Sequence, residues 1–319
     1  MLASVILCTY NRAHLLKRTL RSLARQTMAA EQLEIVVVDD GSSDGTAAVC
    51  ERAGQSLSGM QYIPMSRNLG LAAAGNRGLR AARGDAFLFI DDDCIAQESW
   101  AERLTAALER HPLAAGAIQS PLSNYIKLGH NISQFHPFIE RRREGWVRSI
   151  AGANMGIRRS LIEELGGFDE RSEVPDMELL FRAWAKGHLV HFVPGAVILH
   201  DPDRANLANV LKHASERASK MILLRNKHGS LLRTPYLLRS PDLILLAAPL
   251  IALAVTLEIY AKNPGLVRYS WTAPLVFAQK LAWCWGASQG LRRDRQTGWP
   301  GRSPAAISGR SQQGALRSG

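Results

Sequence analysis

Apolar residues in the first third of the chain follow two alternating patterns, one typical of buried strands and one typical of amphipathic helices. Short apolar runs predict strands at residues 3–9, 34–38, 62–65 and 86–90. Apolar residues at helical spacing predict helices at residues 13–26, about 46–53 and 70–82. Buried strands that alternate with helices are typical of a mostly parallel sheet covered on both faces. The pattern therefore predicts an α/β fold.

The pattern changes after this region. Residues 111–202 are less regular and end in a strand-like stretch, and a helix is predicted at 206–227. Two apolar segments follow, 243–257 without any charge and 271–287 with several tryptophans. Both are short or borderline for a membrane span of about 20 residues. We therefore expect three parts: a catalytic domain at 1–228, an apolar, membrane-associated helical appendage at 229–295, and a disordered basic tail at 296–319.

The formal net charge of +11 favours an anionic partner, which could be nucleic acid, a phosphate-bearing substrate or an anionic membrane surface. Lys and Arg are spread along the chain without the aromatic residues of a known nucleic-acid module, so no nucleic-acid partner is expected. Basic residues also flank the two apolar segments, close to Trp271, Trp283 and Trp285. This arrangement predicts contact with an anionic membrane face. A buried core helix is the alternative for 243–257.

Two features of the sequence indicate the cell compartment: the spacing of the cysteines and the position of the first predicted strand. The four cysteines lie far apart and form neither a C-x-x-C pair nor a zinc-ligand pattern. We therefore expect a reduced, cytoplasmic environment without structural zinc. The first predicted strand begins almost directly after Met1, so a signal peptide is not expected.

Carboxylates gather directly after two of the predicted strands. Asp39 and Asp40 follow one strand, and Asp91, Asp92 and Asp93 follow another. Adjacent like charges repel and must stay hydrated, so three in a row indicate a function rather than stabilisation. Oxygen ligands at a rigid strand end suit Mg²⁺ or Mn²⁺ that also holds phosphate oxygens. Because ligands bind outside the carboxyl ends of parallel strands, both clusters are expected at one site.

Four segments together resemble the inverting, GT-A-fold family 2 glycosyltransferases. They are SVILCTYNR at 4–12, EIVVVDDGSSDGT at 34–46, RNLG at 67–70 and DDD at 91–93, in the order of the family's motifs. The resemblance covers about residues 2–200. It implies a GT-A-type, Rossmann-like fold and a metal-dependent, inverting transfer of a sugar from a nucleotide-diphosphate donor. The implied acceptor is a hydroxyl group of a glycan or lipid, in the synthesis of cell-surface polysaccharide or glycolipid.

The resemblance also implies roles on the donor side. The loop after the first strand would surround the base and ribose, and Asp40 would accept a hydrogen bond from the base. Arg67 and Asn68 either reach the ribose or phosphate or only begin a helix. The loop residues in question are Thr9, Tyr10, Asn11 and Arg12.

The run of three aspartates resembles the family's D-x-D motif. By that match Asp93 contacts Mg²⁺ or Mn²⁺, with Asp91 as a further metal contact. Asp91 or Asp92 contacts the ribose or a metal-bound water. His200 stands before Asp201-Pro202, as in the family, and is either a further metal or diphosphate ligand or a structural histidine.

On the acceptor side, an inverting displacement needs one general base close to the acceptor hydroxyl. The family supplies it from a Glu-Asp pair at a helix start. Here the pair reads Pro175-Asp176, so the first acid is missing, and Asp176 is assigned as the base with Glu178 as a weaker alternative. Asn154 is expected to contact the donor sugar or the acceptor.

Other classes of protein fit less well. A Rossmann dehydrogenase would carry G-x-G-x-x-G after the first strand, and neither that motif nor a Walker A sequence occurs there. A nucleotidyltransferase would also bind a metal through carboxylates at this edge of the sheet, but it would need a glycine-rich N-terminal loop. A non-catalytic nucleotide-sugar-binding subunit of a membrane complex is the second alternative. For an enzyme we expect the cytoplasmic face of the cell membrane, where nucleotide sugars are made.

Overall fold

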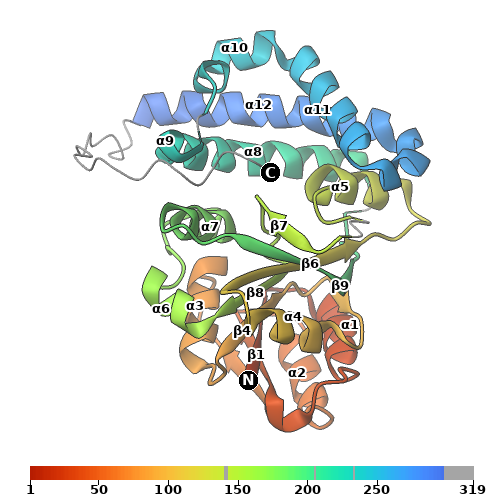
Figure 1. Cartoon of the computed structure of the whole chain (residues 1–319), viewed down its shortest axis with the longest axis vertical. Coiled ribbons are helices and arrows are strands. Elements are labelled where there is room, and N and C mark those ends of the chain that lie inside the picture. Colours follow the sequence, from red (N-terminus) through yellow and green to blue (C-terminus); the bar gives the residue numbers. More distant parts are fainter. Residues whose placement is uncertain (140–142, 205, 233, 298–319) are drawn as a thin grey trace.

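A computed structural model of the chain describes residues 1–139, 143–204, 206–232 and 234–297. Figure 1 shows a sheet domain with helices on its faces and a separate layer of long helices lying across it. The expected disordered tail at 296–319 lies outside the described residues, except for its first two positions, which end the last helix.

Strands of the described residues form one sheet in the order β3-β2-β1-β4-β8-β6-β9-β5, and β7 pairs with β9. They are β1 (Ala3–Thr9), β2 (Leu33–Asp39), β3 (Met60–Pro64), β4 (Ala86–Ile90), β5 (Cys94–Ala96), β6 (Leu113–Gln119), β7 (Gly145–Val147), β8 (Asn154–Arg158) and β9 (Val190–His200). The predicted strands of the first third are all present. Their buried faces, and those of the helices around them, build the main core.

The α/β fold class is confirmed, although the sheet is mixed rather than mostly parallel. β3, β2, β1 and β4 run parallel to one another, whereas β8 is antiparallel to both β4 and β6. The register explains the difference, because Asn154 at the start of β8 pairs with Ile90 at the end of β4. β8 therefore enters at the edge where β4 ends, and it must run back in the opposite direction.

Helices cover both faces of the sheet. These are α1 (Ala13–Leu23), α2 (Thr46–Gly54), α3 (Leu71–Ala81), α4 (Trp100–Leu108), α5 (Tyr125–Phe135), α6 (Arg159–Leu165) and α7 (Pro175–Ala185). In α1 the leucines at helical spacing, Leu15, Leu16, Leu20 and Leu23, are all buried, as an amphipathic helix requires.

The helical layer consists of α8 (Leu207–Lys227), α9 (Gly229–Leu232), α10 (Pro241–Leu246), α11 (Ala248–Lys262) and α12 (Ala273–Thr297). α12 lies along α8 (Figure 1). Gly286 and Gly290 allow this close contact, because a Cβ atom there would lie 2.0 Å from the Ser215 carbonyl oxygen and 2.4 Å from that of Ser219. Much of the Trp-rich segment 271–287 is thus occupied in packing on α8. Among the described helices, none is long and apolar enough to cross a membrane.

Candidate functional site

The loops after β1 and β2 meet at the carboxyl edge of the parallel strands. Thr9 and Asp39 are register partners, and the Asp40 N–H donates to the Thr9 carbonyl oxygen at 2.9 Å. Asn11 has a φ of 53°, which places it in the left-handed region that Asn tolerates. Its side-chain oxygen accepts from the Ser43 N–H at 2.8 Å. Asn11 therefore shapes the predicted nucleotide loop, while its neighbour Tyr10 is exposed.

Asp40 holds the segment that leads into α3. Its two carboxylate oxygens accept from the backbone N–H groups of Leu69 and Gly70, at 2.8 and 2.9 Å. Gly41 has a φ of 82°, and a Cβ atom there would lie 2.6 Å from the Arg67 carbonyl carbon. Arg67 and Asn68 are thereby brought to the same edge as the β1 loop, and both are exposed. A role of Asp40 toward the base stays a prediction.

Arg12 joins the β1 loop to the acidic end of β4. Its guanidinium pairs with Asp92 and with Asp93, each at 2.6 Å, and the Thr9 hydroxyl donates to Asp92 at 2.8 Å. Burial, reinforced by the charges of Asp93 and Asp92, raises the pKa of Asp91 to about 7. Burial also raises the pKa of Asp92 to about 6, against the opposing charge of Arg12.

Asp93 behaves differently from its two neighbours. Burial alone would raise its pKa, but His200 and the paired Arg12 outweigh burial and lower the pKa below its ordinary value. Burial lowers the pKa of His200, so the imidazole is neutral near pH 7 and the Arg12 pair keeps Asp93 ionised. Asp93 is therefore the carboxylate of the three that holds its negative charge most firmly.

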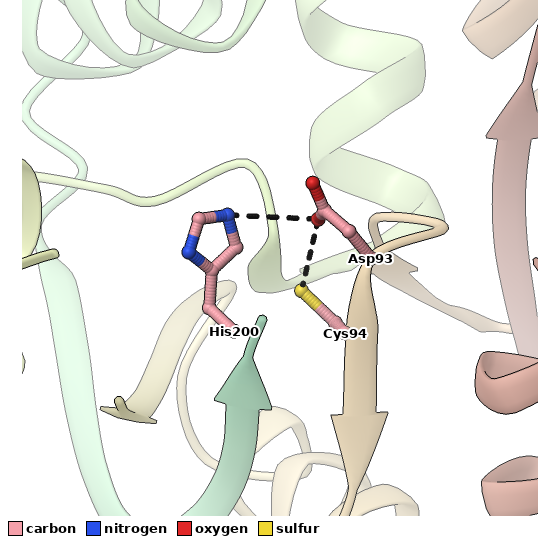
Figure 2. Close-up of side chains that lie close together, drawn as sticks. All are labelled: Asp93, Cys94 and His200. Atoms are coloured by element: carbon pink, nitrogen blue, oxygen red, sulfur yellow. Dashed lines mark hydrogen bonds and ion pairs between the residues drawn. The ribbon is translucent and has the colours of Figure 1, made fainter. Parts of the chain in front are cut away.

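Asp93, Cys94 and His200 form a candidate metal centre, with ligand atoms that all lie within 4.8 Å of one another. Figure 2 shows the imidazole and the thiol pointing toward the Asp93 carboxylate. The pairing of β5 with β9 creates this group, because Cys94 and His200 are register partners. Asp91, also predicted as a metal contact, lies outside the group.

The tautomer of His200 follows from its contacts with Asn131. The Asn131 side-chain nitrogen donates to the His200 carbonyl at 2.8 Å, so the Asn131 oxygen faces His200 Nδ1, 2.7 Å away. Nδ1 must carry the proton, and Nε2 presents a lone pair to Asp93 Oδ1 at 3.5 Å. Two acceptors that face each other in a buried site suit a bridging cation.

Cys94 is the third member of the group. Burial raises the pKa of its thiol well above the ordinary value, and the thiol donates to Asp93 Oδ1 at 3.7 Å. The Asp93 carboxylate is the kind of ligand that suits Mn²⁺ or Mg²⁺, and the His200 imidazole adds a nitrogen donor.

A pocket of about 170 Å³ lies beside the acidic cluster. Asp91 lines it from the end of β4, Asp176 from the first turn of α7, and Arg217 from α8. Arg217 Nη2 is 4.0 Å from Asp176 Oδ2. Gly152 also lines the pocket, and a Cβ atom there would lie 3.2 Å from the Asp176 carboxylate. The predicted donor side and the predicted base therefore face one cavity.

Glu178 lies elsewhere, although it is only two residues from Asp176. Its buried carboxylate accepts from Arg182 Nε with both oxygens, at 2.9 and 2.8 Å. Arg182 also donates to the carbonyl oxygens of Leu165 and Gly167. Glu178 is thus held in a structural pair that ties α7 to the end of α6, and it does not line the pocket.

Asn154 requires a correction, because the structure gives it a structural role instead of a sugar contact. The side chain has no exposed surface. Its oxygen accepts from Trp100 Nε1 at 2.8 Å, and its nitrogen donates to the carbonyl oxygens of Ala117 and Ala196, at 2.9 and 3.0 Å. The amide links β8 to β6, β9 and α4 within the core.

Sequence reasoning missed the basic side chains that surround the acidic edge. Asp201, whose N–H donates to the Asp93 carbonyl, pairs with Arg18 and Lys127. Arg204 lies close enough to Asp93 to affect its charge. Arg18, Lys127 and Arg204 belong to no motif, so only their positive charge could have signalled them. These side chains and Arg12 place positive charge among the carboxylates of this edge, where a bound diphosphate would meet it.

Comparison with known proteins gives a consistent result. The profile of glycosyl transferase family 2 matches residues 4–166. The probable glycosyltransferase YdaM of Bacillus subtilis (strain 168) is 25% identical over 206 residues, which are 61% of this chain and 49% of that protein. Glycosyltransferase AglE of Haloferax volcanii is 25% identical over 170 residues, 52% of this chain and 55% of that protein. The chain thus spans about half the length of these curated relatives.

Solved structures resemble the fold. The mannosyltransferase PcManGT from Pyrobaculum calidifontis, in complex with GDP-Man and Mn²⁺, has a TM-score of 0.62 at 21% identity, covering 92% of this chain and 87% of that one. TarS 1–349 of S. aureus in complex with UDP has a TM-score of 0.54 at 17% identity, covering 93% and 92%.

Proposed function

The chain belongs to glycosyl transferase family 2, and on this premise we propose that it moves a sugar from a nucleotide-diphosphate donor to an acceptor hydroxyl with inversion. The observation that carries the proposal is the shared pocket of Asp91 and Asp176. Asp91 from the donor-side cluster and Asp176, the proposed base, face one cavity, as a direct displacement requires. Neither a nucleotidyltransferase nor a non-catalytic subunit would require Asp176 as a general base.

On the donor side, the loops after β1 and β2 would hold the nucleoside, and the basic side chains around Asp93 would orient the diphosphate. Asp93 and His200 would hold Mn²⁺ or Mg²⁺, which when bound supplies charge stabilisation for the diphosphate leaving group. Asn131 keeps the His200 proton on Nδ1, so Nε2 stays available as a ligand.

On the acceptor side, the Asp176 carboxylate accepts the proton of the attacking hydroxyl. The oxygen forms its bond to the anomeric carbon while the bond to the diphosphate breaks, and the diphosphate leaves with the electron pair. Arg217 Nη2 lies 4.0 Å from Asp176 Oδ2 and would help to orient the carboxylate toward the pocket.

The ligands of the similar solved structures suggest which donors to test. PcManGT was solved with GDP-Man and Mn²⁺, and TarS with UDP-GlcNAc, so GDP- and UDP-sugars are the first donors to test. We propose a glycan or lipid-linked acceptor in the synthesis of a cell-surface glycan. We place the enzyme at the cytoplasmic face of the cell membrane, where donors are made.

A donor screen tests the first half of the proposal. UDP-, GDP- and dTDP-sugars are added with and without Mn²⁺, and the shift in melting temperature reports binding because a ligand of the folded state stabilises it. Hydrolysis of the same donors, with and without EDTA, reports turnover. Binding without any turnover, in the presence of varied acceptors, would favour the non-catalytic subunit.

A pair of variants tests the base. Asp176→Asn should bind the donor normally and lose about 10²–10⁴-fold in turnover, the contribution of a positioned general base. Glu178→Gln is the matched control, two residues away in the same helix, and should keep the catalytic rate of the molecules that remain folded. If Asp176→Asn keeps its rate while Glu178→Gln loses it, the base assignment is wrong.

A further inference from the structure

A stripe of exposed leucines runs along the outer side of α10 and α11. It consists of Leu246, Leu250, Leu253 and Leu257, whose exposed fractions are 81%, 72%, 48% and 61%. We call this stripe the leucine face. The spacing of four, three and four residues places all of them on one side of a helix. Figure 1 shows α10 beyond α12, on the side away from the sheet, and α11 sloping from there down toward α5.

The other side of the same two helices is fully used in packing. Ile244 belongs with α12 and α8 residues to one buried cluster, and Ile259 belongs to a second cluster with residues of α5. The helices are therefore apolar on both sides, while only the inner side is covered within the described part of the chain. An outer stripe of this kind marks an interaction surface rather than a folding requirement.

The basic residues around the leucine face indicate an anionic partner. Residues 236–296 contain seven Lys or Arg against three Asp or Glu. Exposed basic residues stand at both ends of the leucine face, Arg239 just before α10 and Lys262 and Arg268 at and after the end of α11. Two copies of a chain with a net charge of +11 repel each other, whereas anionic lipid attracts it. Trp271, 52% exposed, follows in the next segment, and tryptophan favours the headgroup level of a bilayer.

We propose that the leucine face docks the protein on the surface of an anionic phospholipid bilayer. The leucines enter the boundary between headgroups and acyl chains, and the helices lie in the plane of the membrane. Arg239, Lys262 and Arg268 contact the lipid phosphates. The inference deepens the membrane location given under the proposed function by naming the surface that makes the contact. Vesicle binding is measured without donor or acceptor, so its failure is distinguishable from a failure of the proposed sugar transfer.

The experiment is co-sedimentation of the full chain with vesicles of phosphatidylcholine alone or mixed with phosphatidylglycerol. Wild type should bind the mixed vesicles, and added salt should weaken binding because surface charges are screened. Leu250→Glu combined with Leu257→Glu should weaken binding by about tenfold or more. Leu189→Glu is the matched control, an exposed leucine just before β9, and should bind like wild type.

Circular dichroism confirms that each variant is folded, which is expected because all three leucines are exposed. Equal binding of the double variant and wild type would overturn the inference, and so would equal binding to vesicles with and without phosphatidylglycerol. Sedimentation equilibrium tests whether a second copy of the chain occupies the leucine face instead. If wild type binds no vesicles but forms a dimer, and the double variant stays monomeric, the leucine face is a dimer interface.

Discussion

Replacement of Asn154 by alanine distinguishes a structural amide from a sugar contact. The substitution removes three hydrogen bonds and leaves Trp100 Nε1 and the carbonyl oxygens of Ala117 and Ala196 without their partner. A buried polar group that loses its partner costs about 1–3 kcal/mol. Three such groups give a loss of about 3–6 kcal/mol in the free energy of unfolding, allowing for water that enters the small cavity.

The loss should be visible as a lower melting temperature. A change of 1 kcal/mol shifts the melting temperature by roughly 2 °C in a chain of this size, so a fall of about 6–12 °C is expected. Thermal unfolding of Asn154→Ala is compared with that of Asn68→Ala, the same chemical change at an exposed position of the candidate site. The control should stay within about 0.5 kcal/mol of wild type, as surface substitutions usually do.

Donor affinity supplies the second readout. Asn154→Ala should bind the donor with an unchanged dissociation constant at a temperature where the variant is folded, because the amide has no exposed surface. An unchanged melting temperature combined with a dissociation constant raised about tenfold would refute the reasoning and restore Asn154 as a sugar contact.

Three further outcomes are expected. Asn131→Ala should weaken Mn²⁺ affinity about 10–100-fold in a metal titration, because the His200 tautomer is no longer held; unchanged affinity would contradict the ligand geometry. Gly116→Ala should destabilise by roughly 1–3 kcal/mol or more in urea unfolding, since its Cβ would lie 2.2 Å from the Ala196 carbonyl oxygen. Burial lowers the pKa of Lys280 from 10.5 to about 8, so charged Lys280 is destabilising. Lys280→Met should therefore stabilise the fold relative to wild type below pH 8, and this advantage should shrink as pH rises from 8 to 10.5.

Much of the fold and of the donor side could be predicted from the sequence. Strand and helix periods are local properties, so the apolar runs at β1, β2 and β4 predicted buried strands without any tertiary information. Parallel strands place their carboxyl ends at one edge, and this rule brought Asp40 and Asp93 to a common site before any coordinates were known.

Choices between neighbouring side chains depended on tertiary structure. Asp176 and Glu178 both lie in the first turn of α7, and two residues of helix rotate a side chain by about 200°. One carboxylate thus faces the pocket and the other faces Arg182. The sequence predicts a helix with two acids, but it does not say which side the pocket will lie on.

Contacts between distant segments were decided by the tertiary structure alone. Asn154 is expected from the sequence to contact the donor sugar or the acceptor, yet the closure of β8 between β4 and β6 buries it. His200 reaches Asp93 because β9 pairs with β5. That pairing depends on how all the strands that lie between β5 and β9 along the chain are placed in the sheet. The segments 243–257 and 271–287 are both apolar, and packing on α8 covers much of the second while leaving the leucine face of the first exposed. Composition determines that such segments must be covered, whereas only the fold decides what covers each one.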